Sequence, residues 1–129
     1  RFKNIVDKKI AISNWYKIEL SKFKWIAQEP SNIDMVVNSN WLFTIVLADD
    51  INKDKLIKKL LERGIETRRV FYPLHQMPPF KTYNSSKNLL ESERLSKNGI
   101  SLPSSVNLQR NDIIYIVKVI DEVIRNLMN

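Results

Sequence analysis

The residues most able to do chemistry lie in one short stretch, Ile65 to Lys81, which reads IETRRVFYPLHQMPPFK. A guanidinium group such as that of Arg68 is a planar fork suited to phosphate or carboxylate, and a histidine such as His75 exchanges protons near neutral pH. Tyr72 adds a hydroxyl and a flat aromatic face. The prolines around them fix backbone angles, so this loop can hold a side chain in one geometry. The stretch indicates a candidate binding site.

The same residues are also compatible with a purely structural role. Phe71 and Tyr72 follow a predicted strand and could belong to the core, and His75 could be a structural hydrogen-bonding group. If Arg68 and Arg69 lie in a strand, they point to opposite faces, so at most one of them can face a given site.

Several kinds of chemistry are excluded by residue counts. The chain has no cysteine, which removes disulfides, thiol nucleophiles and cysteine metal sites, and its one histidine removes a multi-histidine metal site. Its two glycines, Gly64 and Gly99, are too far apart for a phosphate-binding glycine loop. The pairs Asp49–Asp50 and Ser104–Ser105 are predicted to be capping or turn residues rather than catalytic groups.

The charge balance points to anions without choosing among them. The 129 residues include 21 basic and 14 acidic side chains, a net charge of +7. Basic domains often meet nucleic acid, phospholipid or phosphorylated small molecules. The lysines are spread along the chain, which favours a solvated surface over a binding stripe. No apolar run approaches the roughly 18 residues of a membrane span, so we expect no membrane partner and a cytoplasmic location.

The pattern of apolar residues predicts a two-layer α+β domain with a small sheet, about three-stranded, covered by helices. Residues 41–47 are aromatic and β-branched, as in a buried strand, and Gly64 stands where a left-handed helix stop is expected. The stretch 25–39, with Pro30 and Asn32, is predicted to be a connection. Helices are predicted over 1–24, 53–63, 89–97 and a last segment capped by Asn111, and strands over 41–47, 65–70 and 100–102.

The segment GIETRRVFYPLHQMPPFK, residues 64–81, closely resembles a motif of the DegT/StrS family of sugar aminotransferases. Three further stretches agree with that family in order: the helix with Ile12, Ser13, Tyr16 and Leu20; the strand 41–47 with the helix 53–63; and SKNGISLPSSVNL, residues 96–108, with the helix after it. The resemblance covers nearly the whole chain, and its Tyr-Pro-Leu-His core is the most specific part.

The resemblance implies a pyridoxal-phosphate enzyme that moves an amino group, usually from glutamate, to a keto group on a nucleotide-linked sugar, for surface polysaccharides. It implies that residues 1–129 are the small C-terminal domain of a fold type I aminotransferase, with residues 1–26 as the helical segment that follows a large cofactor domain. The Schiff-base lysine would belong to that large domain. We therefore expect this chain alone to be inactive, with no catalytic residue and no bound pyridoxal phosphate or metal.

The resemblance also assigns roles near the sugar. His75 and Tyr72 would approach the hexose or the phosphate, and Arg68 would contact phosphate or brace the loop. Arg69 stands where relatives often have proline, which adds a charge beside the loop. The complete enzyme would be a homodimer that binds no nucleic acid.

Two competing interpretations stay open. A basic α+β module for nucleic-acid binding or regulation would show binding that weakens steeply with salt. A free-standing interaction domain derived from an aminotransferase is the other.

Overall fold

The computed structural model describes residues 2–28, 36, 38–83 and 89–129 and has an α+β fold. Its strands form one antiparallel sheet in the order β1-β2-β4-β3. The elements along the chain are α1 (Phe2–Leu20), β1 (Ile26–Gln28), β2 (Phe43–Leu47), α2 (Lys53–Glu62), β3 (Arg68–Arg69), the short 3₁₀ turns η1 (Leu74–Gln76) and η2 (Pro78–Tyr83), α3 (Leu90–Asn98), β4 (Gly99–Leu102) and α4 (Arg110–Met128).

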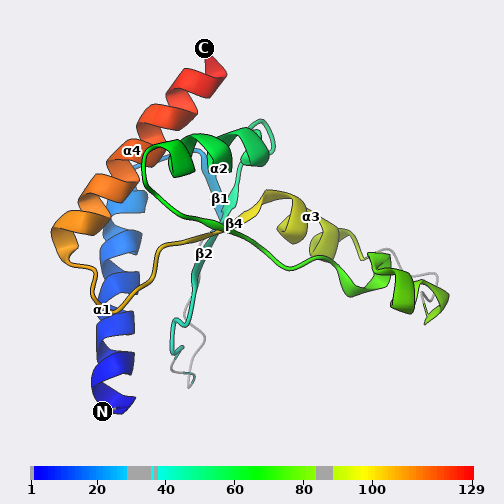
Figure 1. Cartoon of the computed structure of the whole chain (residues 1–129), viewed down its shortest axis with the longest axis horizontal. Helices are drawn as coiled ribbons and strands as arrows, with labels where there is room; N and C mark the ends of the chain where they lie inside the picture. The colour runs from blue at the N-terminus through cyan, green and yellow to red at the C-terminus, as the bar shows by residue number, and fades with distance from the viewer. Residues whose placement is uncertain (1, 29–35, 37, 84–88) are drawn as a thin grey trace.

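One face of the sheet forms the hydrophobic core. Phe43 pairs with Leu102 and Ile45 with Ile100, so the apolar side chains of β2 and β4 stand on the same face. The helices α1, α2 and α4 bury their apolar sides in the same cluster. Figure 1 shows α1 and α4 on one side of the sheet and α3 on the other.

Tyr16 links the leading helix to the sheet. It lies one turn from Ile12 and from Leu20, and all three side chains are buried, as a helical spacing of four requires. Its ring stacks on Phe43 with centroids 4.8 Å apart, and its hydroxyl donates to the Pro103 carbonyl over 2.8 Å. The buried phenol is therefore both packed and hydrogen-bonded, which fixes α1 against the sheet.

The opposite face of the sheet is small and polar. Thr44 and Ser101 share a hydrogen bond of 2.8 Å between their hydroxyls, and Val46 pairs with Gly99. A Cβ at Gly99 would lie 2.4 Å from the Leu95 carbonyl oxygen and 2.5 Å from Val70 Cγ2. Only glycine fits here, because α3 turns directly into β4 while Val70 packs against that turn.

Residues 71–83 and α3 extend away from the sheet as an arm (Figure 1). Its apolar side chains are largely in solvent: Phe71 is 77% exposed, Leu74 64% and Leu90 65%. Pro73, in contrast, is buried, so the arm is covered by other residues at this position. The arm therefore exposes apolar side chains of the kind that the core buries.

The structure refines the predicted elements. The sheet has a fourth strand, β1, in the stretch predicted to be a connection; Pro30 and Asn32 of that stretch lie outside the described residues. The leading helix ends at Leu20, and the predicted strand 65–70 is reduced to β3. The short strand follows from the prolines and the exposed side chains around it, since neither extends a sheet ladder.

One capping prediction needs correction and two predictions are confirmed. The last helix is capped by Gln109, in a reciprocal pair with Asp112, and not by Asn111. Asp49 and Asp50 lie in the turn before helix α2, which agrees with the predicted capping or turn role, and Asn52 caps that helix by accepting from the Lys55 amide. Gly64 has φ +76°, which is the left-handed helix stop that the sequence predicted.

No helix in the described part of the chain is both long enough and apolar enough to cross a membrane.

Candidate functional site

Strand β3 sends its two arginines to different sides of the molecule. Arg68 pairs with Ser101 and Arg69 with Ile100 in the sheet, and alternate residues of a strand face opposite ways. Arg69 lines a pocket beside α2 and α3, whereas Arg68 lines a pocket at the other end of β4. The sequence predicted that only one of the two could face a given site.

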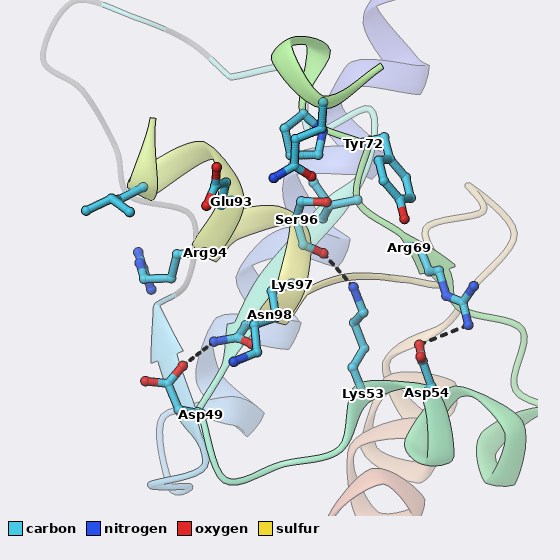
Figure 2. A pocket seen from close by; sticks show the side chains of 14 residues that line it. Asp49, Lys53, Asp54, Arg69, Tyr72, Glu93, Arg94, Ser96, Lys97 and Asn98 are labelled. Atoms are coloured by element: carbon cyan, nitrogen blue, oxygen red, sulfur yellow. Dashed lines mark hydrogen bonds and ion pairs between the residues drawn. The ribbon is translucent and has the colours of Figure 1, made fainter. Parts of the chain in front are cut away.

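The pocket at Arg69 lies where the arm meets α2, and we call it the junction pocket (Figure 2). It has a volume of about 640 Å³. Its polar lining comes from the end of β2, the first turn of α2, β3, the start of the arm and α3. The lining residues are Asp49, Lys53, Asp54, Arg69, Val70, Tyr72, Pro73, Gln76, Leu90, Glu93, Arg94, Ser96, Lys97 and Asn98.

Polar contacts across the junction pocket connect the arm to the core. The Asn98 amide donates to an Asp49 carboxylate oxygen over 2.5 Å, and the Arg69 guanidinium pairs with Asp54 at 2.9 Å. The Lys53 ammonium donates to the Ser96 carbonyl over 2.5 Å. These contacts hold α3 at a set distance from α2 (Figure 2).

The electrostatic setting of Lys53 differs from that of a surface lysine. Partial burial lowers the pKa of Lys53; Asp54 opposes this shift and Arg69 adds to it. Its ammonium lies at the C-terminal end of α3, where the helix dipole favours a cation. The Lys53 ammonium is therefore a charged group held in place at the wall of the junction pocket.

Tyr72 stands at the rim of the junction pocket. Its side chain is in the open, with 70% of the residue exposed. Figure 2 shows its ring above Arg69 with the hydroxyl directed toward the pocket. The sequence left open whether Tyr72 belongs to the core, and the exposure shows that it does not.

His75 is the opposite case, because its side chain is only 11% exposed. Its Nε2 lies 2.9 Å from a carboxylate oxygen of Glu93 on α3. The hydrogen bonds from His75 and from Gln76 hold the pKa of the Glu93 carboxyl below its usual value. One ring nitrogen of His75 is thus engaged in fixing η1 to α3.

Tyr72 and His75 share a second concavity, the arm pocket, of about 400 Å³. It lies between the 70–75 segment and α3, and its wall is mostly apolar: Val70, Phe71, Tyr72, Pro73, Leu74, His75, Leu89, Ser92 and Leu95. The two residues therefore lie beside an open hollow and not beneath a continuous surface.

Arg68 lies apart from Tyr72 and His75. It lines a pocket of about 600 Å³, the sheet-end pocket, whose lining includes Lys9, Trp41, Ser104 and Tyr115. Lys9 donates from its ammonium to the carbonyl oxygens of Trp41 and Ser104, and partial burial lowers its pKa. The three residues singled out from sequence are thus divided between two separate places.

Sequence reasoning missed Lys53, Glu93 and Asn98. Each has a role through a residue that is distant in sequence: Lys53 contacts Ser96, Glu93 contacts His75, and Asn98 contacts Asp49. Arg69 was noted, but only as a departure from a family pattern.

The two partly buried lysines of these pockets do not fit the role of a Schiff-base lysine. Such a site needs a free lysine amine for the imine and a partner for the ring nitrogen. Lys53 and Lys9, the lysines whose pKa values burial lowers, both donate to main-chain carbonyls. The junction-pocket carboxylates Asp49, Asp54 and Glu93 are already bonded to Asn98, Arg69 and His75. We assign no cofactor step to these residues.

The described part of the chain also has no group of three or more acidic or histidine side chains that could hold a metal ion.

A family model for the DegT/DnrJ/EryC1/StrS aminotransferases matches residues 1–121. Among curated relatives, the GDP-perosamine synthase of Caulobacter vibrioides is 28% identical over 115 residues, covering 88% of this chain and 31% of the relative. The GDP-perosamine synthase of Vibrio cholerae is 30% identical over 131 residues, covering 100% of this chain and 34% of the relative. The chain thus spans about a third of the length of these relatives.

Solved structures agree on the fold. Helicobacter pylori PseC, an aminotransferase involved in pseudoaminic acid biosynthesis, has a TM-score of 0.82 at 18% identity, covering 94% of this chain and 33% of that one. The aminotransferase TlmJ from Streptoalloteichus hindustanus has a TM-score of 0.80 at 19% identity, covering 96% of this chain and 33% of that one. The α+β arrangement described above is that of a segment found in fold type I aminotransferases.

Proposed function

Because the chain belongs to the DegT/DnrJ/EryC1/StrS aminotransferase family, we propose that it is the substrate-binding C-terminal domain of a pyridoxal-phosphate enzyme. The complete protein would transfer an amino group from glutamate to a nucleotide-linked keto sugar. The product would serve surface polysaccharide synthesis.

The observation that carries this proposal is the family match over residues 1–121 of 129. Curated relatives named GDP-perosamine synthase favour a GDP-linked sugar as the substrate. Since the chain spans about a third of those relatives, the remaining two thirds would supply the Schiff-base lysine. The complete protein would be a cytoplasmic homodimer.

Within this chain, Tyr72 and His75 are proposed to contact the sugar end of the substrate. Tyr72 supports this through its exposed ring and hydroxyl, and both residues border the arm pocket. His75 would act from a fixed position, since Glu93 holds its ring. Arg68, on the far side of β3, would contact phosphate in the sheet-end pocket or brace the loop.

The nucleic-acid or regulatory module is not favoured. The family match concerns aminotransferases, and basic side chains in both large pockets lie among carboxylates rather than in an uninterrupted stripe. The salt dependence of any binding to DNA would distinguish the two.

The test is amino transfer by the complete protein with pyridoxal phosphate, glutamate and a GDP-linked keto sugar, followed as amino-sugar formation. His75→Ala should raise KM or lower kcat for the keto sugar while the absorbance of the internal imine is unchanged. The control is Lys118→Gln, an exposed position on α4 that lines neither large pocket. It should leave both parameters unchanged.

Three results would each contradict a part of the proposal. Failure of the complete protein to aminate any nucleotide-linked keto sugar would remove the function. Unchanged kinetics in His75→Ala would remove His75 from the site. The third result concerns the 129-residue chain alone. If it shows an imine absorbance with pyridoxal phosphate, and one lysine substitution abolishes that absorbance, the cofactor lysine lies in this chain and not in the remaining two thirds of the protein.

A further inference from the structure

We propose that the junction pocket is a phosphate-binding site in which Lys53 and Arg69 hold the anion. Lys53 and Arg69 are not among the residues proposed to contact the sugar, although Val70, Tyr72 and Pro73 line both this pocket and the arm pocket. The ligand chemistry is a phosphate or diphosphate group, either free or carried by a nucleotide.

The first observation is that the two cations come from different elements and reach the same space. Lys53 opens α2 and Arg69 ends β3, yet both side chains line one pocket of about 640 Å³ (Figure 2). An ammonium and a guanidinium together suit a phosphate, since the guanidinium can bind it through two parallel hydrogen bonds.

The second observation is that neither cation is matched by a buried carboxylate. The Lys53 ammonium donates its hydrogen bond to the Ser96 carbonyl oxygen, which carries no full charge. Arg69 does pair with Asp54, but the two side chains are 62% and 69% exposed. An exposed ion pair contributes little because water solvates both partners, so a phosphate with two negative charges can displace Asp54 from the guanidinium.

The other carboxylates of the pocket are already engaged. Asp49 accepts from the Asn98 amide, and Glu93 is bonded to His75. The lining as a whole holds four cations, Lys53, Arg69, Arg94 and Lys97, against three carboxylates, Asp49, Asp54 and Glu93. Arg94 pairs with Glu91. Asp54 is bonded to Arg69, the cation proposed to bind the phosphate, so Asp54 is the carboxylate that competes directly with an incoming anion.

Two further features favour a phosphate-bearing ligand. The first turn of the ten-residue helix α2 lies at the pocket wall, and the partial positive charge of a helix N-terminus attracts phosphate. The exposed ring of Tyr72 stands at the rim, where it can contact a sugar or base attached to the phosphate.

This inference deepens the proposed function, because a nucleotide-linked sugar carries a diphosphate, and to that extent it rests on it. With the diphosphate in the junction pocket, Arg68 would have the other of its two proposed roles, that of bracing the loop. The binding test needs neither cofactor nor turnover. If the complete protein fails to transfer amino groups but this chain binds pyrophosphate in the junction pocket, the function falls and the site stands. If transfer occurs and pyrophosphate does not bind there, the site falls and the function stands.

The experiment is a titration of the isotopically labelled 129-residue chain with inorganic pyrophosphate, GDP and guanosine, followed by backbone amide shifts. Pyrophosphate and GDP should shift the amides of residues 53, 54, 69 and 97, and guanosine alone should not. Arg69→Gln should weaken pyrophosphate binding about tenfold, the loss expected for a charge-assisted bidentate contact.

Two variants sharpen the result. Asp54→Asn removes the competing carboxylate and should tighten binding severalfold. Lys55→Gln is the control for Arg69→Gln: it removes one positive charge from the first turn of α2, at a position that does not line the pocket, and should leave the affinity unchanged.

The proposal is overturned if pyrophosphate shifts the amides of residues 101–105 at the sheet-end pocket instead. It is also overturned if Arg69→Gln binds as tightly as the unchanged chain, if Asp54→Asn binds no more tightly, or if Lys55→Gln loses as much affinity as Arg69→Gln. Guanosine binding as tight as that of GDP would equally contradict it.

Discussion

The core layer and the arm of this protein use their apolar residues in opposite ways. In the core layer, Phe43 is 1% exposed and stacks on a buried Tyr16. In the arm, Phe71 is 77% exposed and packs into no buried cluster. The same type of side chain thus stabilises the fold in one region and lies at the surface in the other.

The difference teaches where stability and binding reside. The core is held by burial of apolar area, whereas the arm is held to it by polar contacts at Asn98, Lys53 and Arg69. Polar contacts at a solvent-exposed junction contribute less than burial and can be exchanged for contacts with a ligand. The arm is therefore the region suited to binding.

The largest expected effect contrasts two phenylalanines. Phe43→Ala should lower the free energy of unfolding by about 3–5 kcal/mol, because it removes a buried ring and leaves a cavity. Phe71→Ala should change it by less than about 0.5 kcal/mol, since the ring is in solvent. Urea denaturation followed by circular dichroism measures both. Equal losses in the two variants would mean that Phe71 is covered in solution.

The next effect contrasts the two glycines. Gly99→Ala should cost about 1–3 kcal/mol, because a methyl group there overlaps the Leu95 carbonyl and Val70. Hydrogen exchange should quicken in α3 and near Val70. Gly64→Ala meets no atom within 4 Å, so its cost of about 1–2 kcal/mol comes from the positive φ alone and should leave exchange in α3 unchanged. Faster exchange in α3 for both variants would refute this separation.

A smaller effect concerns Tyr16 at high pH. Burial raises the pKa of the Tyr16 phenol above the ordinary 10.0, so the folded state favours the neutral form. The resulting stabilisation is fully present below pH 10.0 and is lost as the pH rises above that value. Tyr16→Phe should cost about 1 kcal/mol at neutral pH, through loss of the bond to Pro103, and should reduce the alkaline decline. Unfolding curves at neutral and alkaline pH provide the measurement.

The smallest effect concerns the inner contact of the arm. Hydrogen bonds from His75 and Gln76 lower the pKa of the Glu93 carboxyl below its ordinary 4.5. The contribution of this contact is present above pH 4.5 and is lost as the pH falls through the lowered pKa. Acidification should therefore quicken hydrogen exchange at residues 75–77 before it affects α4. Glu93→Gln should show fast exchange there already at neutral pH, and an unchanged profile in that variant would contradict the role of the contact.

Much of the fold was predictable from the sequence because the apolar positions of the local sequence pattern are the ones that the fold buries. The apolar spacing of α1 and α4, the β-branched run of β2 and the stop at Gly64 all appeared as predicted, within a few residues at the ends. Strand β1 was missed because three residues without a repeating pattern become a strand only when the edge of β2 pairs with them.

The candidate site was predictable only in part. The proline-rich loop that carries Tyr72 followed from residue type, whereas the exposure of Tyr72 did not. The alternation of a strand placed Arg68 and Arg69 on opposite sides. The burial of His75 against Glu93 did not follow, because the two residues are 18 positions apart and meet only when α3 folds back on the loop.

The amino-acid sequence by itself determined the family, the α+β class and the choice of the candidate loop, since these depend on residue types and their spacing along the chain. Only the tertiary structure decided which cations share a pocket. Lys53, Arg69 and Asn98 belong to separate elements, and the packing of α2, β3 and α3 around the sheet is what brings their charges and hydrogen-bonding groups within reach of one another.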